Sequence, residues 1–107
     1  MLICALLLSS GFLYGSELHC SVSQGLVEVS IAEVTVFPGE KSSYETLEGY
    51  MFAVKNLGDS KFELDVFDSS TPSRSYSSGS LRSSSDSLSW TYWSRETLIE
   101  TTCRLKQ

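Results

Sequence analysis

The chain has 107 residues, which leaves room for a single domain. Its 13 Asp and Glu residues outnumber its 8 Lys and Arg residues, for a net charge of −5. An acidic excess of this kind does not attract phosphate backbones or anionic membranes, so nucleic-acid binding and cationic antimicrobial action are disfavoured.

Residues 1–16 are expected to be a secretory signal peptide. They carry no charged side chain, and Leu2 to Leu8 form an apolar run. This run is too short for a transmembrane helix, which needs roughly 17–25 apolar residues. It matches the apolar region of about 7–15 residues that precedes a cleavage site with small residues. Gly15 and Ser16 supply such residues, so we place cleavage after one of them and the mature domain at residues 17–107. A buried N-terminal strand or helix of a cytosolic protein is the alternative, and no membrane anchor is expected.

Two cysteines remain once Cys4 leaves with the signal peptide. Cys20 and Cys103 lie near the two ends of the mature domain. An even pair in an exported chain predicts a disulfide, which would tie those ends together. Two free thiols or an intermolecular bond are the alternatives.

Most of the mature sequence alternates apolar and polar residues with a period of two, which is typical of half-buried strands. In 26–37 the apolar phase slips near Ala32–Glu33, which predicts a bulge or a break between two strands. Residues 50–67 predict a hairpin around Asn56–Asp59. Strands are also expected near 88–92 and 97–105, whereas 42–48 allows one helical turn at most. We therefore predict an all-β fold with six to eight strands, a small antiparallel β-sandwich that is Ig-like or similar, or a small barrel.

Residues 69–89 differ in composition from the rest, because 12 of these 21 residues are Ser. Such a segment has too few apolar side chains to offset the entropy of ordering it. We expect a long flexible loop, with O-linked sugars as a further possibility.

Catalytic and metal-binding residues are sparse. A Ser–His–acid triad would need His19, the only histidine in the chain. Glu63 and Asp65 share a strand face and could direct two oxygens at a calcium ion, although a solvated outer face explains them as well. We expect no enzyme activity, no cofactor and no bound metal.

The aromatic residues near the C-terminus carry the functional prediction. Trp90 and Tyr92 share one side of a strand, so Trp93 must take the other side. An exposed Trp anchors protein interfaces and also stacks on sugars. Phe67 has the same outward placement after Val66, so it is expected to join Trp93 in an outward patch.

From these residues we predict a secreted, non-enzymatic protein-interaction module. It would bind a protein partner outside the cell or in the secretory lumen through Trp93 and Phe67, with Trp90 as a third candidate. The alternative is a carbohydrate-binding domain that uses Trp90, Tyr92 and Trp93. A small hydrolase that depends on His19 ranks third.

Overall fold

The computed structural model describes residues 15–106, and all of its regular structure in this range is β-strand. Eight strands follow one another along the chain: β1 (Ser16–Gln24), β2 (Val27–Val36), β3 (Lys41–Leu47), β4 (Tyr50–Gly58), β5 (Lys61–Asp68), β6 (Ser73–Ser80), β7 (Leu88–Trp93) and β8 (Leu98–Leu105). The predicted signal peptide lies outside the described residues except for Gly15 and Ser16, and β1 begins at Ser16.

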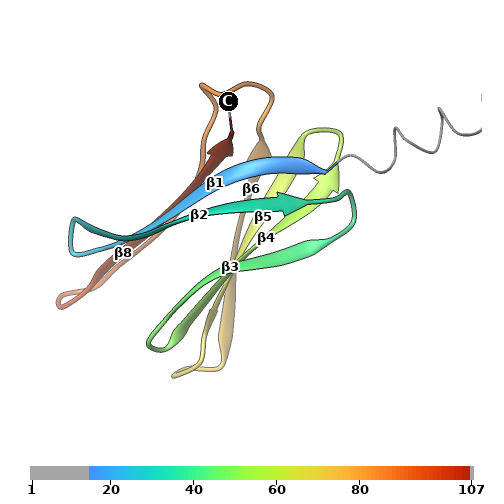
Figure 1. Cartoon of the computed structure of the whole chain (residues 1–107). Coiled ribbons are helices and arrows are strands. Elements are labelled where there is room, and N and C mark those ends of the chain that lie inside the picture. The colour runs from blue at the N-terminus through green and yellow to red at the C-terminus, as the bar shows by residue number, and fades with distance from the viewer. Residues whose placement is uncertain (1–14, 107) are drawn as a thin grey trace, which may run out of the picture.

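The strands form two four-stranded antiparallel sheets that pack as a small sandwich (Figure 1). Sheet A has the order β2-β1-β8-β7, and sheet B has the order β3-β4-β5-β6. The hairpin ends of the two sheets project in different directions, so the sheets diverge at one end of the molecule (Figure 1). This arrangement confirms the predicted β-sandwich.

The core lies between the inner faces of the sheets, where alternate residues of β1, β4, β5 and β8 are buried. The Cys20–Cys103 disulfide is part of it, and both cysteines are fully buried. They are direct partners on β1 and β8, so the bridge joins the first and last strands as predicted. Around it pack further apolar side chains of both sheets: Leu18, Val36, Val54, Phe62, Leu64, Leu81 and Leu88.

A second cluster lies toward the diverging end of the sandwich. Val22, Phe52, Val66 and Ile99 form its buried part, and Trp90 packs against them. The alternating apolar residues that predicted the 50–67 hairpin and the last strand are the ones that fill these two clusters.

The structure corrects the expected phase slip in the first long segment. Residues 27–36 form one strand, and the shift in its pairing with β1 falls between Val22 and Ser23, opposite Val29, not near Ala32–Glu33. Val36 is buried, while Ile31 is opposite Ser21 on the outer face and is 62% exposed. The prediction was wrong because it placed every apolar residue of the segment on the core side.

The Ser-rich segment is not one long loop. Residues 73–80 form β6, which pairs with β5 along its whole length, and only 69–72 and 81–87 connect strands. Its inward positions are small, because β6 approaches β7 at the edge of the sandwich: Ser77 donates a hydrogen bond to the Ser89 carbonyl. A Cβ atom added at Gly79 would lie 3.3 Å from Leu88. Hydrophobic periodicity does not detect a strand whose inward positions must be small.

Candidate functional site

Two hairpin ends of sheet A meet at the diverging end of the sandwich. The backbone N–H of Gly25 in the β1–β2 turn donates to the Leu98 carbonyl at the start of β8, at 2.8 Å. Leu98 is in turn the direct partner of Trp93 on β7. The turn residue Leu26 is therefore held close to the Trp93–Leu98 pair.

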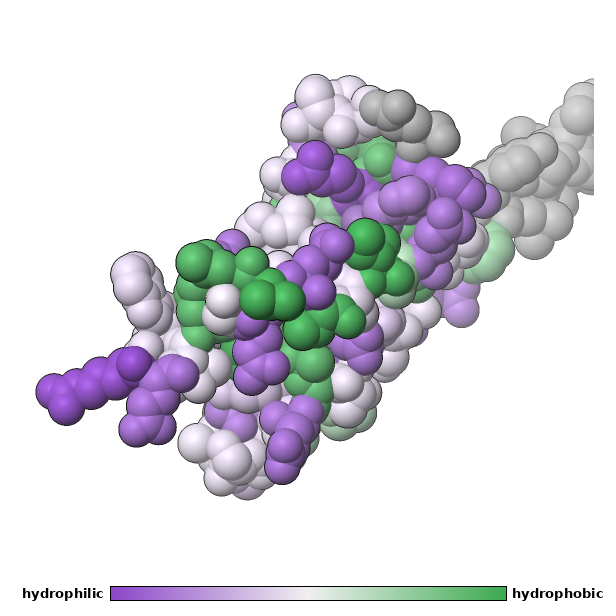
Figure 2. Space-filling view, turned by 60° about the vertical axis from the view of Figure 1, so that its left-hand side comes forward, coloured by the Kyte–Doolittle hydropathy of each residue, from purple (hydrophilic) through white to green (hydrophobic). Residues whose placement is uncertain are grey.

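The apolar side chains at this end are open to solvent. Leu26 is 83% exposed and Trp93 81%, and Leu98 is partly exposed. We call these three residues the tip. Val27, which is 63% exposed, pairs with Gln24, the partner of the buried Ile99, and so lies on the other face of sheet A. Figure 2, in which this end is turned toward the viewer, shows hydrophobic side chains gathered on the surface and bordered by hydrophilic ones. Large exposed apolar side chains grouped in this way are common at interaction sites.

Trp93 lies on the outer face of sheet A, and Trp90 lies on the inner face. Trp90 packs edge-on against Phe52, with ring centroids 6.2 Å apart, and stacks on Tyr92 at 6.5 Å. Trp90 is therefore half-buried in the second core cluster, and Tyr92 is partly exposed at its margin. The predicted opposition of Trp93 to Trp90 and Tyr92 is confirmed, so the three rings do not form a single platform.

Phe67 does not join Trp93. It lies on β5 in sheet B and pairs with Met51 and Arg74, whose side chains share the outer face of that sheet. Trp93 is on the outer face of sheet A, so the sandwich separates the two residues. The expected common patch was wrong, because a strand's alternation shows that two side chains face outward but not which sheet each strand joins.

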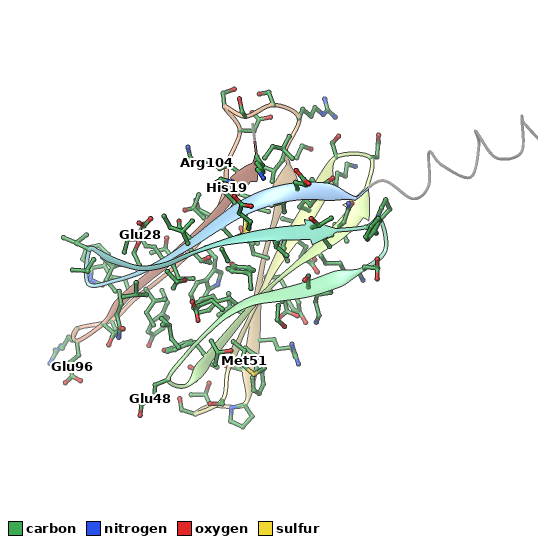
Figure 3. All side chains as sticks on the ribbon, viewed as in Figure 1. His19, Glu28, Glu48, Met51, Glu96 and Arg104 are labelled. Carbon is green, nitrogen blue, oxygen red and sulfur yellow. A yellow bond between two sulfur atoms is a disulfide. The ribbon has the colours of Figure 1, made fainter. Side chains whose placement is uncertain are left out.

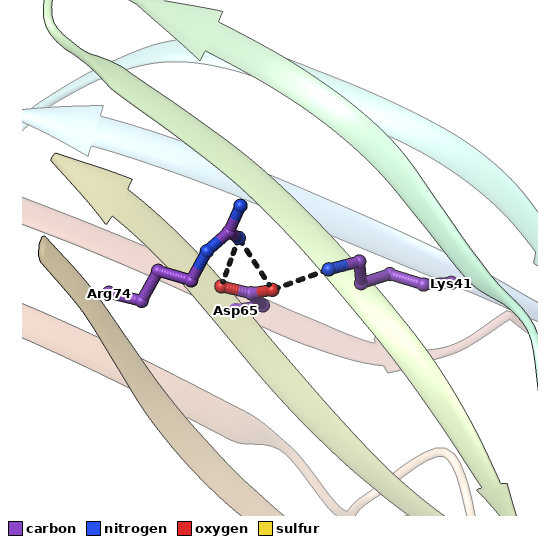
Figure 4. A network of polar contacts seen from close by, with 3 residues as sticks. All are labelled: Lys41, Asp65 and Arg74. Atoms are coloured by element: carbon purple, nitrogen blue, oxygen red, sulfur yellow. Dashed lines mark hydrogen bonds and ion pairs between the residues drawn. The ribbon is translucent and has the colours of Figure 1, made fainter. Parts of the chain in front are cut away.

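The outer face of sheet B carries a buried carboxylate. Asp65 accepts a hydrogen bond from Lys41 Nζ at 2.7 Å and contacts from Arg74 Nη1 at 3.1 and 3.3 Å (Figure 4). Only 4% of its side chain is exposed, because these two side chains cover it. Arg74 also lies over the Phe67 ring, 4.9 Å from the centroid. The suggested calcium site at Glu63 and Asp65 is therefore wrong, since two cationic side chains occupy the Asp65 oxygens.

His19 lies on the outer face of sheet A, next to Arg104 (Figure 3). Its Nε2 is 3.2 Å from Glu33 Oε1, and Lys106 Nζ is 3.3 Å from the other oxygen of Glu33. Ser21, two residues along the same face, directs its hydroxyl to the Thr102 carbonyl at 3.5 Å. His19 Nε2 thus lies near a carboxylate but makes no hydrogen bond within the described residues, to this serine or to any other group.

Sequence reasoning identified Trp93 but missed Leu26 and Leu98. Leu98 reads as an ordinary strand residue, and Leu26 as the start of an apolar strand. A Gly-Leu pair at a chain reversal was the available signal, because it places a large apolar side chain where turns usually have small or polar residues.

Residues 15–106 contain no group of three or more His, Cys, Asp or Glu side chains placed to hold a metal ion. Within the same range, no helix is long and apolar enough to cross a membrane. No protein-family model, curated protein or solved structure matches the chain.

Proposed function

We propose that the protein is an exported, non-enzymatic interaction module that binds a protein partner outside the cell or in the secretory lumen. Export is supported by the buried Cys20–Cys103 disulfide, because such bonds persist in oxidising compartments. The apolar run in residues 1–16 supports it independently.

Trp93 carries the binding proposal. Its side chain is 81% exposed, and its direct cross-strand partner is Leu98, which is itself partly exposed. Exposing an indole to water is unfavourable by about 1.5–3 kcal/mol relative to burying it, on the scale of large apolar side chains. Tryptophan is also among the residues that most often dominate binding energy at interfaces. We therefore assign Trp93 as the principal anchor.

Trp93→Ala tests this assignment. Because the side chain contributes little to the core, we expect the free energy of unfolding to change by less than about 0.5 kcal/mol. Binding should weaken at least about tenfold, as for a central interface residue. The measurement is crosslinked capture from the medium of secreting cells, quantified by mass spectrometry, together with urea denaturation of both proteins.

Leu57→Ala is the matched control. Leu57 is 46% exposed on β4, away from the tip, so its truncation should leave both capture and stability unchanged. A large loss of stability in Trp93→Ala would show that Trp93 is a core residue. Equal capture by native and Trp93→Ala protein would contradict the proposal.

A glycan array with the native protein distinguishes carbohydrate binding from binding to a protein partner. That alternative has to rely on Trp93 alone, or on Tyr92 and the half-buried Trp90, because the strand divides the three rings between two faces. Binding to sugars that is lost in Trp93→Ala would favour it over a protein partner.

A further inference from the structure

We propose that the partner of the tip is a second copy of this chain, and that the tip of one copy binds the outer face of sheet B of the next. This inference rests on the proposed function, since it names the partner of the same site. Three observations support it: the charge around the tip, the charge of the outer face of sheet B, and the shape of that face.

The tip has an acidic border. Glu28 and Glu100 flank Ser23 on the outer face of sheet A, and Glu96 lies in the β7–β8 turn beside Arg95. Figure 3 places Glu28 and Glu96 at the hairpin ends of this sheet. Three carboxylates against one guanidinium leave the apolar tip with two net negative charges.

The outer face of sheet B is basic, although the protein as a whole is acidic. The pairing of the strands places the residues of this face in three rows: Lys41, Lys55, Glu63 and Ser78; Ser43, Ala53, Asp65 and Tyr76; and Thr46, Met51, Phe67 and Arg74. Lys61, the first residue of β5, lies on the same outer face. Within the strands, four cations against two carboxylates give these rows two net positive charges, in a chain whose total is −5.

The same face contains a depression suited to a flat aromatic side chain. The small side chains of Ser43 and Ala53 leave a hollow of about 210 Å³, which Met51, Phe67, Lys41 and Arg74 border. Arginine and methionine are favourable neighbours for an indole ring. Asp65 holds Lys41 and Arg74 in place, so little side-chain entropy remains to be lost when a ring enters.

Charge decides which surfaces of two copies can meet. Two tips repel each other, as do two basic faces, whereas a tip and a basic face attract. A contact between two different surfaces leaves one tip and one face free unless the copies close on one another, so it builds rings or chains of copies. The association should strengthen with protein concentration and weaken with salt.

Sedimentation velocity of the purified secreted protein tests the proposal. We expect the average mass to rise with concentration at low salt and to fall when salt is added. Trp93→Ala in the tip and Lys55→Glu in the basic face should each weaken self-association at least about tenfold. Arg82→Glu makes the same charge change at an exposed position between β6 and β7, and it should associate like the native protein.

Mixing the two defective variants is the decisive measurement. Trp93→Ala retains an intact basic face and Lys55→Glu an intact tip, so an equimolar mixture should form dimers that do not grow further. Ser43→Leu, which fills the depression at an exposed position, replaces Lys55→Glu if that variant does not fold. A mixture that stays monomeric would overturn the proposal.

A native protein that stays monomeric at every concentration and salt would also overturn it. If Trp93 is nevertheless needed to capture a different protein, the proposed function stands and only the second copy is wrong. Association that survives both Trp93→Ala and Lys55→Glu would show that copies meet through other surfaces.

Discussion

Leu26 combines two unfavourable features in one residue. It follows Gly25 in the β1–β2 turn, and both residues have positive φ, 61° for Gly25 and 70° for Leu26. Tight hairpin turns with two such residues favour Gly, Asn or Asp, because a larger side chain crowds the backbone at positive φ. Leu26 also leaves its side chain 83% exposed. Backbone strain at an exposed apolar residue is the kind of feature that binding sites retain.

Leu26→Asn should therefore stabilise the protein while weakening the proposed self-association. Relief of the left-handed conformation is worth about 1 kcal/mol in the free energy of unfolding. Urea denaturation measures the gain, and sedimentation measures the loss of association. Leu57→Asn serves as the control, because Leu57 is an exposed leucine without positive φ and should gain no stability. A Leu26→Asn protein that is less stable than the native one would show that this side chain has a structural role.

A chain of hydrogen bonds joins sheet B to sheet A beside the second core cluster. Thr101 on β8 donates its hydroxyl proton to the Ser21 carbonyl on β1, at 2.8 Å. Tyr44 on β3 lies 2.6 Å from the same Thr101 oxygen, and it must donate, since Thr101 has no second proton. Sheet B is thereby tied to the two central strands of sheet A.

Burial raises the pKa of Tyr44 to about 12. In the unfolded chain a tyrosine titrates near pH 10, so between pH 10 and 12 the unfolded state loses this proton while the folded state keeps it. The stability from neutral Tyr44 is complete below pH 10 and is lost as the pH rises toward 12, by about 2 kcal/mol. Tyr44→Phe cannot ionise, so its stability should fall less over this range. Urea denaturation at pH 8, 10 and 11 measures the difference, and parallel curves for the two proteins would contradict the assignment.

The Cys20–Cys103 disulfide joins the first and last strands of the structure. Cys20 and Cys103 are 83 residues apart in the sequence, so the bridge restricts nearly all of the described chain in the unfolded state. Such a restriction is worth about 4–5 kcal/mol in the chain-entropy treatment. A domain of this size has a total stability of only about 5–15 kcal/mol.

Replacing both Cys20 and Cys103 by Ala should lower the free energy of unfolding by about 2–5 kcal/mol. Urea denaturation of the oxidised native protein and of the double variant provides the comparison. Native protein reduced before denaturation is the control and should behave like the variant. If the double variant kept native stability, packing alone would hold the first and last strands together.

Alternation along the chain was sufficient to predict the β-sandwich, the 50–67 hairpin, the last strand and the outward position of Trp93. These features follow from the two-residue repeat of a strand, which is a local property of the sequence. The pairing of Cys20 with Cys103 also followed, because only two cysteines remain after residue 16.

The partners of each strand were decided by the tertiary structure. Only the order of the strands within the sheets placed Phe67 and Trp93 on opposite sides of the sandwich. The same pairing made a strand of the Ser-rich residues 73–80 and brought Leu26 beside Leu98. The division of charge between an acidic tip and a basic face depends on the same order. A sequence specifies which way a side chain points relative to its own strand, whereas its neighbours come from strands that are distant in the chain.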